Sequence, residues 1–164
     1  YCKLLDEAVK ELKGERIEKL AEVKMEFDLD IYIPESYISD SQHRVEIYRK
    51  LSDAESVEKV KEVEAEVVDR FGALPQEVED LLNFTCAKIA ASHLGISRVS
   101  VEKDLLTLQF SEDKKLGKKE IENLRKKIEF PLEFAVDKTL KLFVQLKPGS
   151  EKKTLSVKNL LQRL

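Results

Sequence analysis

The hydrophobic positions between residues 57 and 71 recur every three or four residues, which predicts an amphipathic helix. Its apolar side is formed by Val57, Val60, Val63, Val67 and Phe71. Acidic residues recur at similar steps, and a rotation of about 100° per residue places them on the opposite side. These residues, called the acidic stripe below, are Glu58, Glu62, Glu66 and Asp69. We therefore predict a helix with one buried side and one acidic side.

The residues after this helix carry the signals of a tight corner that leads into a second helix. Gly72 can adopt the left-handed conformation that ends a helix, and Leu74 can fold back onto the last turn. Pro75 suits the first turn of the next helix, where its missing N–H costs nothing. We predict a locally specified structural corner formed by Arg70, Phe71, Gly72, Leu74 and Pro75.

The acidic stripe has two interpretations. Like charges four residues apart destabilise a helix by about 0.2–0.5 kcal/mol per pair. Glu66 and Asp69 also lie near the negative end of the helix dipole, so a compensating cation is expected. Arg70 can bond to Glu66 and leave the stripe solvated, or a cationic partner surface can dock on it. Periodicity alone favours the solvated stripe.

The pattern before this helix predicts an irregular start followed by one strand and one short helix. Residues 1–13 form an amphipathic helical pattern, and residues 15–25 are a charged linker or a loose helix. Alternation over residues 27–33 predicts a strand that ends at a proline. Asp40 or Ser41 can cap a short helix. The side chains expected to point inward from it are Val45, Tyr48 and Leu51.

The pattern after the corner predicts a buried helix and a sheet. The helix from Pro75 to about Leu94 is apolar on most sides, and Gly95 closes it. The period then changes to two, which predicts hairpins over 99–110 and 132–146, each followed by a helix. We predict an α+β fold: a helical N-terminal half packed on an antiparallel sheet built from two hairpins with intervening helices.

Composition limits the classes of protein to consider. The 164 residues are 42% hydrophobic and 37% charged with a net charge of −3, which argues against a polybasic nucleic-acid wrapper. Cys2 and Cys86 are the only cysteines, so we expect no disulfide framework and a reducing, cytoplasmic location. No apolar run approaches a membrane span. The chain does not begin with Met, so we expect it to be a piece of a longer protein.

The residue types needed for catalysis are present without the spacing that catalysis requires. The five glycines are isolated at element boundaries, so no phosphate-binding loop is predicted. Cys86 lies in a segment expected to be buried, and His93 is more than one helical turn away, so a core thiol is favoured over a nucleophile. The histidines and cysteines have no metal-binding spacing. We predict no enzyme, no metal and no cofactor in this chain.

A basic patch is the second surface of interest. It consists of Lys114, Lys115, Lys118, Lys119, Arg125, Lys126 and Lys127, with Lys152, Lys153 and Lys158 near the end. Nucleic-acid modules usually combine such charge with exposed aromatic residues or with a helix that reads a groove. Here the nearby phenylalanines fall in the apolar pattern of the strands, so contact with DNA is the less favoured hypothesis.

Three motifs together resemble the C-terminal domain of bacterial transcription-repair coupling factor. They are Ile33-Pro34-Glu35-Ser36-Tyr37-Ile38, then Arg44 with Tyr48-Arg49-Lys50-Leu51, then Asp69-Arg70-Phe71-Gly72 with Leu74-Pro75. The order and spacing match over about fifty residues. Residues 1–14 are similar to the end of the motor region that precedes this domain. The resemblance divides the chain into residues 1–26, the motor tail and linker, and residues 27–164, the C-terminal regulatory domain.

The resemblance implies a function for the parent protein and for this domain. The parent would be an ATP-dependent DNA translocase, with ATP and Mg in its motor, that removes stalled RNA polymerase and recruits nucleotide-excision repair. Its C-terminal domain would dock on the N-terminal repair-recruiting module and mask it until the parent engages polymerase. In such proteins the matching acidic positions, Glu66 and Asp69, face arginines of that module, with Glu62 at the rim.

The leading hypothesis is therefore a noncatalytic docking domain. Its direct partner would be the N-terminal module of the same chain, and its indirect partners the excision-repair damage-recognition protein and RNA polymerase; no membrane is involved. DNA would be bound mainly by the absent motor. One rival is a DNA-contacting accessory domain that uses the basic patch. Another is a domain that only stabilises the motor.

Overall fold

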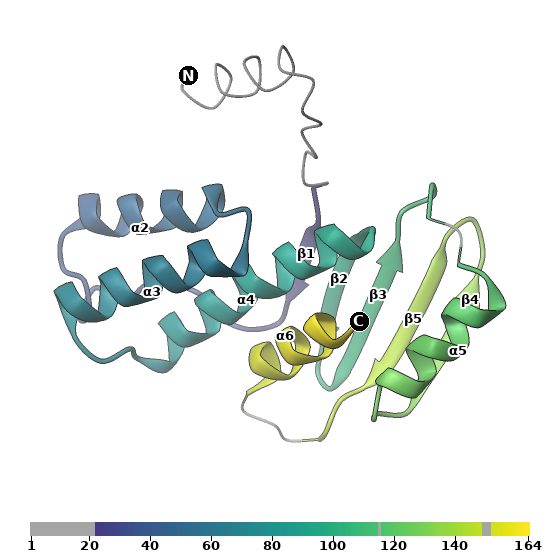
Figure 1. Cartoon of the computed structure of the whole chain (residues 1–164). Coiled ribbons are helices and arrows are strands. Elements are labelled where there is room, and N and C mark those ends of the chain that lie inside the picture. The colour runs from purple at the N-terminus through teal and green to yellow at the C-terminus, as the bar shows by residue number, and fades with distance from the viewer. Residues whose placement is uncertain (1–21, 115, 149–151) are drawn as a thin grey trace, which may run out of the picture.

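The computed structural model describes residues 22–114, 116–148 and 152–164. Its helices and strands follow one another along the chain as shown in Figure 1. In order they are β1 (Lys24–Phe27), α2 (Ser41–Asp53), α3 (Val57–Phe71), α4 (Gln76–Leu94), β2 (Ile96–Glu102), β3 (Leu105–Phe110), α5 (Lys118–Lys127), β4 (Leu132–Val136), β5 (Leu140–Gln145) and α6 (Lys153–Arg163). The predicted α+β class is confirmed. The helix predicted over residues 1–13 lies outside the described residues.

The five strands form one sheet in the order β1-β2-β3-β5-β4. Both predicted hairpins are present, β2 with β3 and β4 with β5, and β3 joins them by pairing antiparallel with β5. The sheet is mixed rather than wholly antiparallel, because β1 pairs in parallel with β2. Alternate residues of the strands face the helices, as the sequence pattern predicted.

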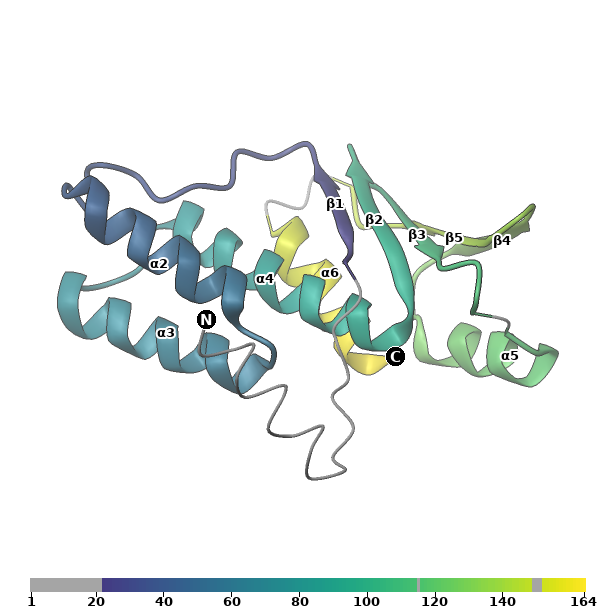
Figure 2. The ribbon, with the colours of Figure 1, turned by 90° about the horizontal axis from the view of Figure 1, so that it is seen from above.

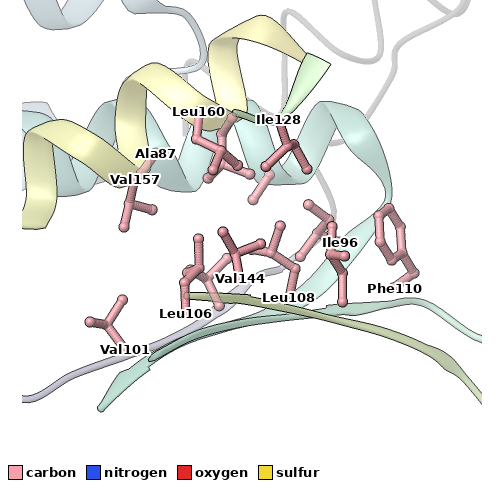
Figure 3. Close-up of a cluster of buried hydrophobic side chains, with 14 of the residues drawn as sticks. Ala87, Ile96, Val101, Leu106, Leu108, Phe110, Ile128, Val144, Val157 and Leu160 are labelled. Carbon is pink, nitrogen blue, oxygen red and sulfur yellow. The ribbon is translucent and has the colours of Figure 1, made fainter. Parts of the chain in front are cut away.

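One face of the sheet is covered by helices α4 and α6, and α5 lies on the same side (Figure 2). The core fills the space between the sheet and these helices (Figure 3). Leu106, Leu108 and Val144 from the sheet meet Ala87 of α4 and Val157 of α6, and all five are fully buried. Burial of this apolar surface is the main stabilising contribution to the fold.

A second core lies between α2, α3 and the first turns of α4. It contains Ile47 and Leu51 from α2, Val60, Val63 and Val67 from α3, and Val78, Leu81, Leu82, Cys86 and Ile89 from α4. Helix α4 therefore contributes side chains to both cores, which explains why its sequence is apolar on most sides. The prediction of a central buried helix is confirmed.

The strand predicted over residues 27–33 is wrong beyond its first residue. Strand β1 instead begins at Lys24, inside the segment predicted as a linker, and ends at Phe27. The chain then leaves the sheet, and the Asp28 carboxylate accepts a hydrogen bond from the Lys103 N–H at 2.7 Å. Ile33 and Ile38 are buried in the helical core. The alternating pattern arose because an extended segment buries every second side chain against helices, as a strand does against a sheet.

Helix α2 begins where predicted, but one of its predicted inward residues is exposed. The Asp40 carboxylate caps the helix by accepting a hydrogen bond from the Gln42 N–H at 2.8 Å. Val45 is 54% exposed, whereas Ile47 is buried with Leu51. The hydroxyl of Tyr48 accepts a hydrogen bond from the Ile33 N–H at 2.6 Å, so Tyr48 lies at the edge of the core.

Candidate functional site: the acidic side of helix α3

Helix α3 has the buried side and the acidic side that the sequence predicted. Val60, Val63 and Val67 are buried in the helical core, and Val57 and Phe71 pack partly against it. The side-chain oxygen of Ser56 caps the helix by accepting a hydrogen bond from the Lys59 N–H at 3.3 Å. The core thus fixes the rotation of α3 and determines where each residue of the acidic stripe points.

The acidic stripe divides into an outer part and a part that faces α2. An α-helix turns about 100° per residue, so each four-residue step from Glu58 to Glu62 to Glu66 rotates the side chain by about 40°. Glu66 reaches the flank of the helix and is half-buried, while Glu58, Glu62 and Asp69 remain exposed. We call the exposed side, carrying Glu58, Glu62 and Asp69, the outer face of α3.

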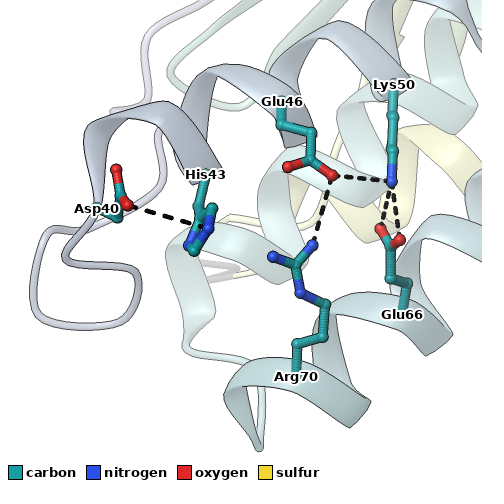
Figure 4. Close-up of polar contacts among 6 residues, drawn as sticks. All are labelled: Asp40, His43, Glu46, Lys50, Glu66 and Arg70. Atoms are coloured by element: carbon teal, nitrogen blue, oxygen red, sulfur yellow. Dashed lines mark hydrogen bonds and ion pairs between the residues drawn. The ribbon is translucent and has the colours of Figure 1, made fainter.

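Glu66 is bonded to helix α2 through Lys50 (Figure 4). The ammonium of Lys50 donates to both Glu66 carboxylate oxygens at 2.8 Å and lies 3.2 Å from Glu46 Oε1. Arg70 Nη1 lies 3.5 Å from the same Glu46 oxygen. The predicted bond between Arg70 and Glu66 is therefore wrong. We call these four residues, Glu46, Lys50, Glu66 and Arg70, the α2–α3 charge network.

The pKa values within this network favour the charged forms. The hydrogen bond with Glu66, and next that with Glu46, raises the pKa of Lys50. The hydrogen bond with Lys50 lowers the pKa of Glu46, and the positive charges of Lys50 and Arg70 act in the same direction. The side chains of Lys50 and Glu66 remain 39% and 36% exposed, so solvent screening reduces the net contribution to stability.

The outer face retains its negative charge. Lys59 lies 3.4 Å from Glu62, but both side chains are about two-thirds exposed, at 65% and 68%, so this pair is weak. Asp69 makes no ion pair within the described part of the chain. Val68 beside it is 42% exposed, which adds an apolar contact to the surface. A groove of about 430 Å³ runs between α2 and α3, lined by Lys50, Asp53, Ala54, Glu55, Lys59, Glu62, Val63 and Glu66.

The structural corner adjoins this surface and holds the end of α3. Gly72 has φ 92° and ψ −163°, so its φ is positive as predicted but its ψ lies outside the left-handed helical region. The hydroxyl of Tyr37 donates a hydrogen bond to the Gly72 carbonyl at 2.7 Å. Leu74 packs partly against the helical core, and Pro75 stands immediately before the first residue of α4. The guanidinium of Arg70 lies 4.9 Å from the centre of the Phe71 ring.

Three residues of this site were missed by the sequence reasoning: Tyr37, Glu46 and Lys50. Lys50 is 16 residues from Glu66, and their contact depends on how α2 packs against α3. Periodicity within one helix carries no such signal. The motif Tyr48-Arg49-Lys50-Leu51 was noted for its resemblance, but it does not indicate which of its two cations reaches α3.

The other candidate groups are dispersed. Cys86 is buried, and its burial raises the pKa of the thiol, whereas His93 is exposed. Among the described residues no group of three or more His, Cys, Asp or Glu could hold a metal ion. None of the helices in the described ranges is long and apolar enough to cross a membrane.

The basic patch is only partly available. The lysines of α5 are exposed, but Arg125 lies over the Phe134 ring at 5.2 Å. Lys153 and Lys158 contact Asp28 at 4.0 Å and Asn83 at 3.4 Å. The predicted patch therefore loses part of its charge to contacts within the fold.

The fold and this surface define a small α+β module whose distinguishing chemistry is charge carried on the outside of its helices. The TRCF domain family matches residues 27–121. The chain is 32% identical over 147 residues to the transcription-repair-coupling factor of Staphylococcus aureus (strain USA300), covering 88% of this chain and 12% of that protein. It is 41% identical over 101 residues to that of Staphylococcus haemolyticus (strain JCSC1435), covering 60% of this chain and 9% of that protein.

A crystal structure of the C-terminal domain of transcription-repair coupling factor has the same fold. Its TM-score is 0.77 at 23% sequence identity, and the match covers 87% of this chain and 89% of that one. The chain belongs to the transcription-repair-coupling factor family and has the fold of that C-terminal domain. The resemblance predicted from the sequence is confirmed.

Proposed function

We propose that this domain is a noncatalytic regulatory module of an ATP-dependent DNA translocase that couples transcription to nucleotide-excision repair. Membership of the family supports a role in transcription-repair coupling. The chain spans only 12% of the length of the Staphylococcus aureus relative, so the motor, with its ATP and Mg, belongs to other parts of the parent. The role of the domain is then to bind another surface rather than to carry out a reaction.

The partner surface that we propose is the N-terminal repair-recruiting module of the same parent chain. The observation that carries this proposal is the outer face of α3, where Glu62 and Asp69 are exposed and Asp69 lacks an ion pair within the described residues. Cationic side chains of the module would meet these carboxylates, with Glu66 at the α2 edge. Docking would mask the module from the excision-repair damage-recognition protein until the parent engages RNA polymerase.

Charge pairs at an exposed surface suit a reversible interface. Each exposed pair contributes about 0.2–1 kcal/mol and is weakened by salt. A few such pairs give a docked state that a competing partner can release. Electrostatic complementarity of this kind provides specificity more than strength.

The test removes two outer carboxylates from the full-length parent. Glu62→Ala combined with Asp69→Ala is expected to weaken docking and to raise the affinity for the damage-recognition protein, roughly two- to tenfold for two exposed pairs. Surface plasmon resonance at low and high salt measures this affinity. Glu120→Ala with Glu122→Ala on α5 is the matched control, because these carboxylates are also exposed and helical. An affinity no higher than that of the wild-type protein would exclude the docking role.

The second candidate function is DNA contact by α5. The observation that favours it is that no residue of α5 is buried and its last turn carries Arg125, Lys126 and Lys127. The stacking of Arg125 on Phe134 and the acidic residues within α5 reduce its attraction for phosphates. We therefore place this function second.

A further inference from the structure

The α2–α3 charge network lies at the edge of the proposed docking face, and the docking proposal alone does not explain it. Its central residue is Lys50, which donates to both oxygens of Glu66 at 2.8 Å. Glu46 holds Lys50 from the same helix at 3.2 Å, an (i, i+4) pair. The ammonium is thus fixed between two carboxylates from two helices, and Figure 4 shows it pointing from α2 toward α3.

The network carries no net charge, because its two carboxylates are matched by two cations. Arg70 is directed toward Glu46 at 3.5 Å and packs over Phe71 at 4.9 Å. The charge of Glu66 is therefore cancelled within the domain. The charge that a partner meets comes from the outer face, which lies on a different side of α3.

We infer that Lys50 is the specificity-determining residue of the docking face: by occupying Glu66, it removes that carboxylate from the set available to a cationic partner. This inference rests on the proposed docking function and adds a regulator to it. Lys50 competes with the partner's cations for Glu66. It does not itself contact the partner.

The geometry of α3 states what the partner must present. Glu62 and Asp69 are seven positions apart, which corresponds to about 10 Å along the helix axis and almost the same direction around it. A partner with two cationic groups at about this separation would engage both. Glu66 lies between them along the axis but is turned toward α2, so it joins the set only when Lys50 is absent or displaced.

The test uses the full-length parent with Lys50→Met, Glu66→Gln and the two combined. The affinity for the damage-recognition protein is measured at two salt concentrations. Lys50→Met frees the Glu66 carboxylate, so docking should tighten and the affinity should fall, roughly two- to fivefold for one exposed pair. Glu66→Gln leaves the Lys50 cation beside the docking face, so the affinity should rise by a similar factor. The double variant should return close to the wild-type value.

Two controls separate this inference from a general effect on folding. Lys50→Arg retains the cation and should behave as the wild-type protein does, and Lys50→Gln should reproduce Lys50→Met. Lys50 is 39% exposed, so these variants should unfold within a few degrees of one another in circular dichroism.

The outcome also separates the inference from the docking proposal. If Lys50→Met leaves the affinity unchanged, or if the double variant matches Glu66→Gln alone, Lys50 does not control the docking face. The inference alone is then wrong, provided that Glu62→Ala with Asp69→Ala raises the affinity. If that pair also has no effect, the docking proposal is wrong as well.

Discussion

The hydrogen bond between Thr154 and Asp80 attaches helix α6 to helix α4 and allows a quantitative prediction of stability. The Thr154 hydroxyl donates to Asp80 Oδ1 at 2.7 Å, and Thr154 is fully buried. Thr154→Val keeps the shape of the side chain and removes the donor. Hydrogen bonds to charged groups contribute about 1.5–3 kcal/mol.

The structure places the expected loss below the upper end of that range. Asp80 is half-buried, so water can reach its carboxylate, and it also accepts a hydrogen bond from the Gln76 side chain at 3.1 Å. We therefore expect Thr154→Val to lower the free energy of unfolding by about 1–2 kcal/mol. For a chain of this size the midpoint of thermal unfolding should fall by about 2–8 °C.

Urea and thermal unfolding of the 164-residue chain, followed by far-ultraviolet circular dichroism, measure the effect. Thr107→Val in β3 is the matched control, since the Thr107 hydroxyl makes no hydrogen bond within the described ranges and valine suits a strand. It should change the free energy of unfolding by less than about 0.5 kcal/mol. A double-mutant cycle with Asp80→Ala isolates the pair. Equal effects of Thr154→Val and Thr107→Val would refute the reasoning.

Two further predictions concern the corner and the basic patch. Gly72 has φ 92° with open space around its Cβ position, so Gly72→Ala should cost about 2 kcal/mol through backbone strain alone, measured by urea unfolding. Gly117→Ala, at φ −77°, should cost less than about 1 kcal/mol, and equal costs would contradict this explanation. Duplex DNA titrated into the chain should show no binding at roughly 50 mM salt. Binding there that falls steeply by about 200 mM would favour the DNA hypothesis instead.

Much of the fold was predictable because its signals are local. The hairpins over β2–β3 and β4–β5 follow from alternation that matches the period of a strand, and α3 follows from its valines. Gly95, in the left-handed conformation, ends α4 where the sequence indicated. The pairing of β1 with β2 was not predictable in the same way, because a parallel partner distant along the chain leaves no mark in the pattern of a four-residue strand.

The candidate site was predictable in composition and only partly in geometry. The acidic stripe and the buried valines were assigned correctly to opposite sides of α3, since both depend on rotation within one helix. Whether Glu66 is solvated, bonded to Arg70 or bonded to α2 depends on the packing of two helices. That packing brings Lys50, rather than Arg70, to Glu66. The residues that set the charge at the α2 edge therefore lie on a different helix from the stripe itself.

The central position of α4 determines how the outer face of α3 is held. Helix α4 contributes Cys86 and Ile89 to the helical core, and Ala87 and Ala91 to the core against the sheet. Moving α3 relative to the sheet would therefore expose apolar surface in both cores, whereas exposed charge pairs contribute only about 0.2–1 kcal/mol each. Release of a docked partner should accordingly break the contacts of the outer face and leave the domain itself intact. The exchange of Lys50 between a bound and a displaced state is then a change of side chains on a rigid support.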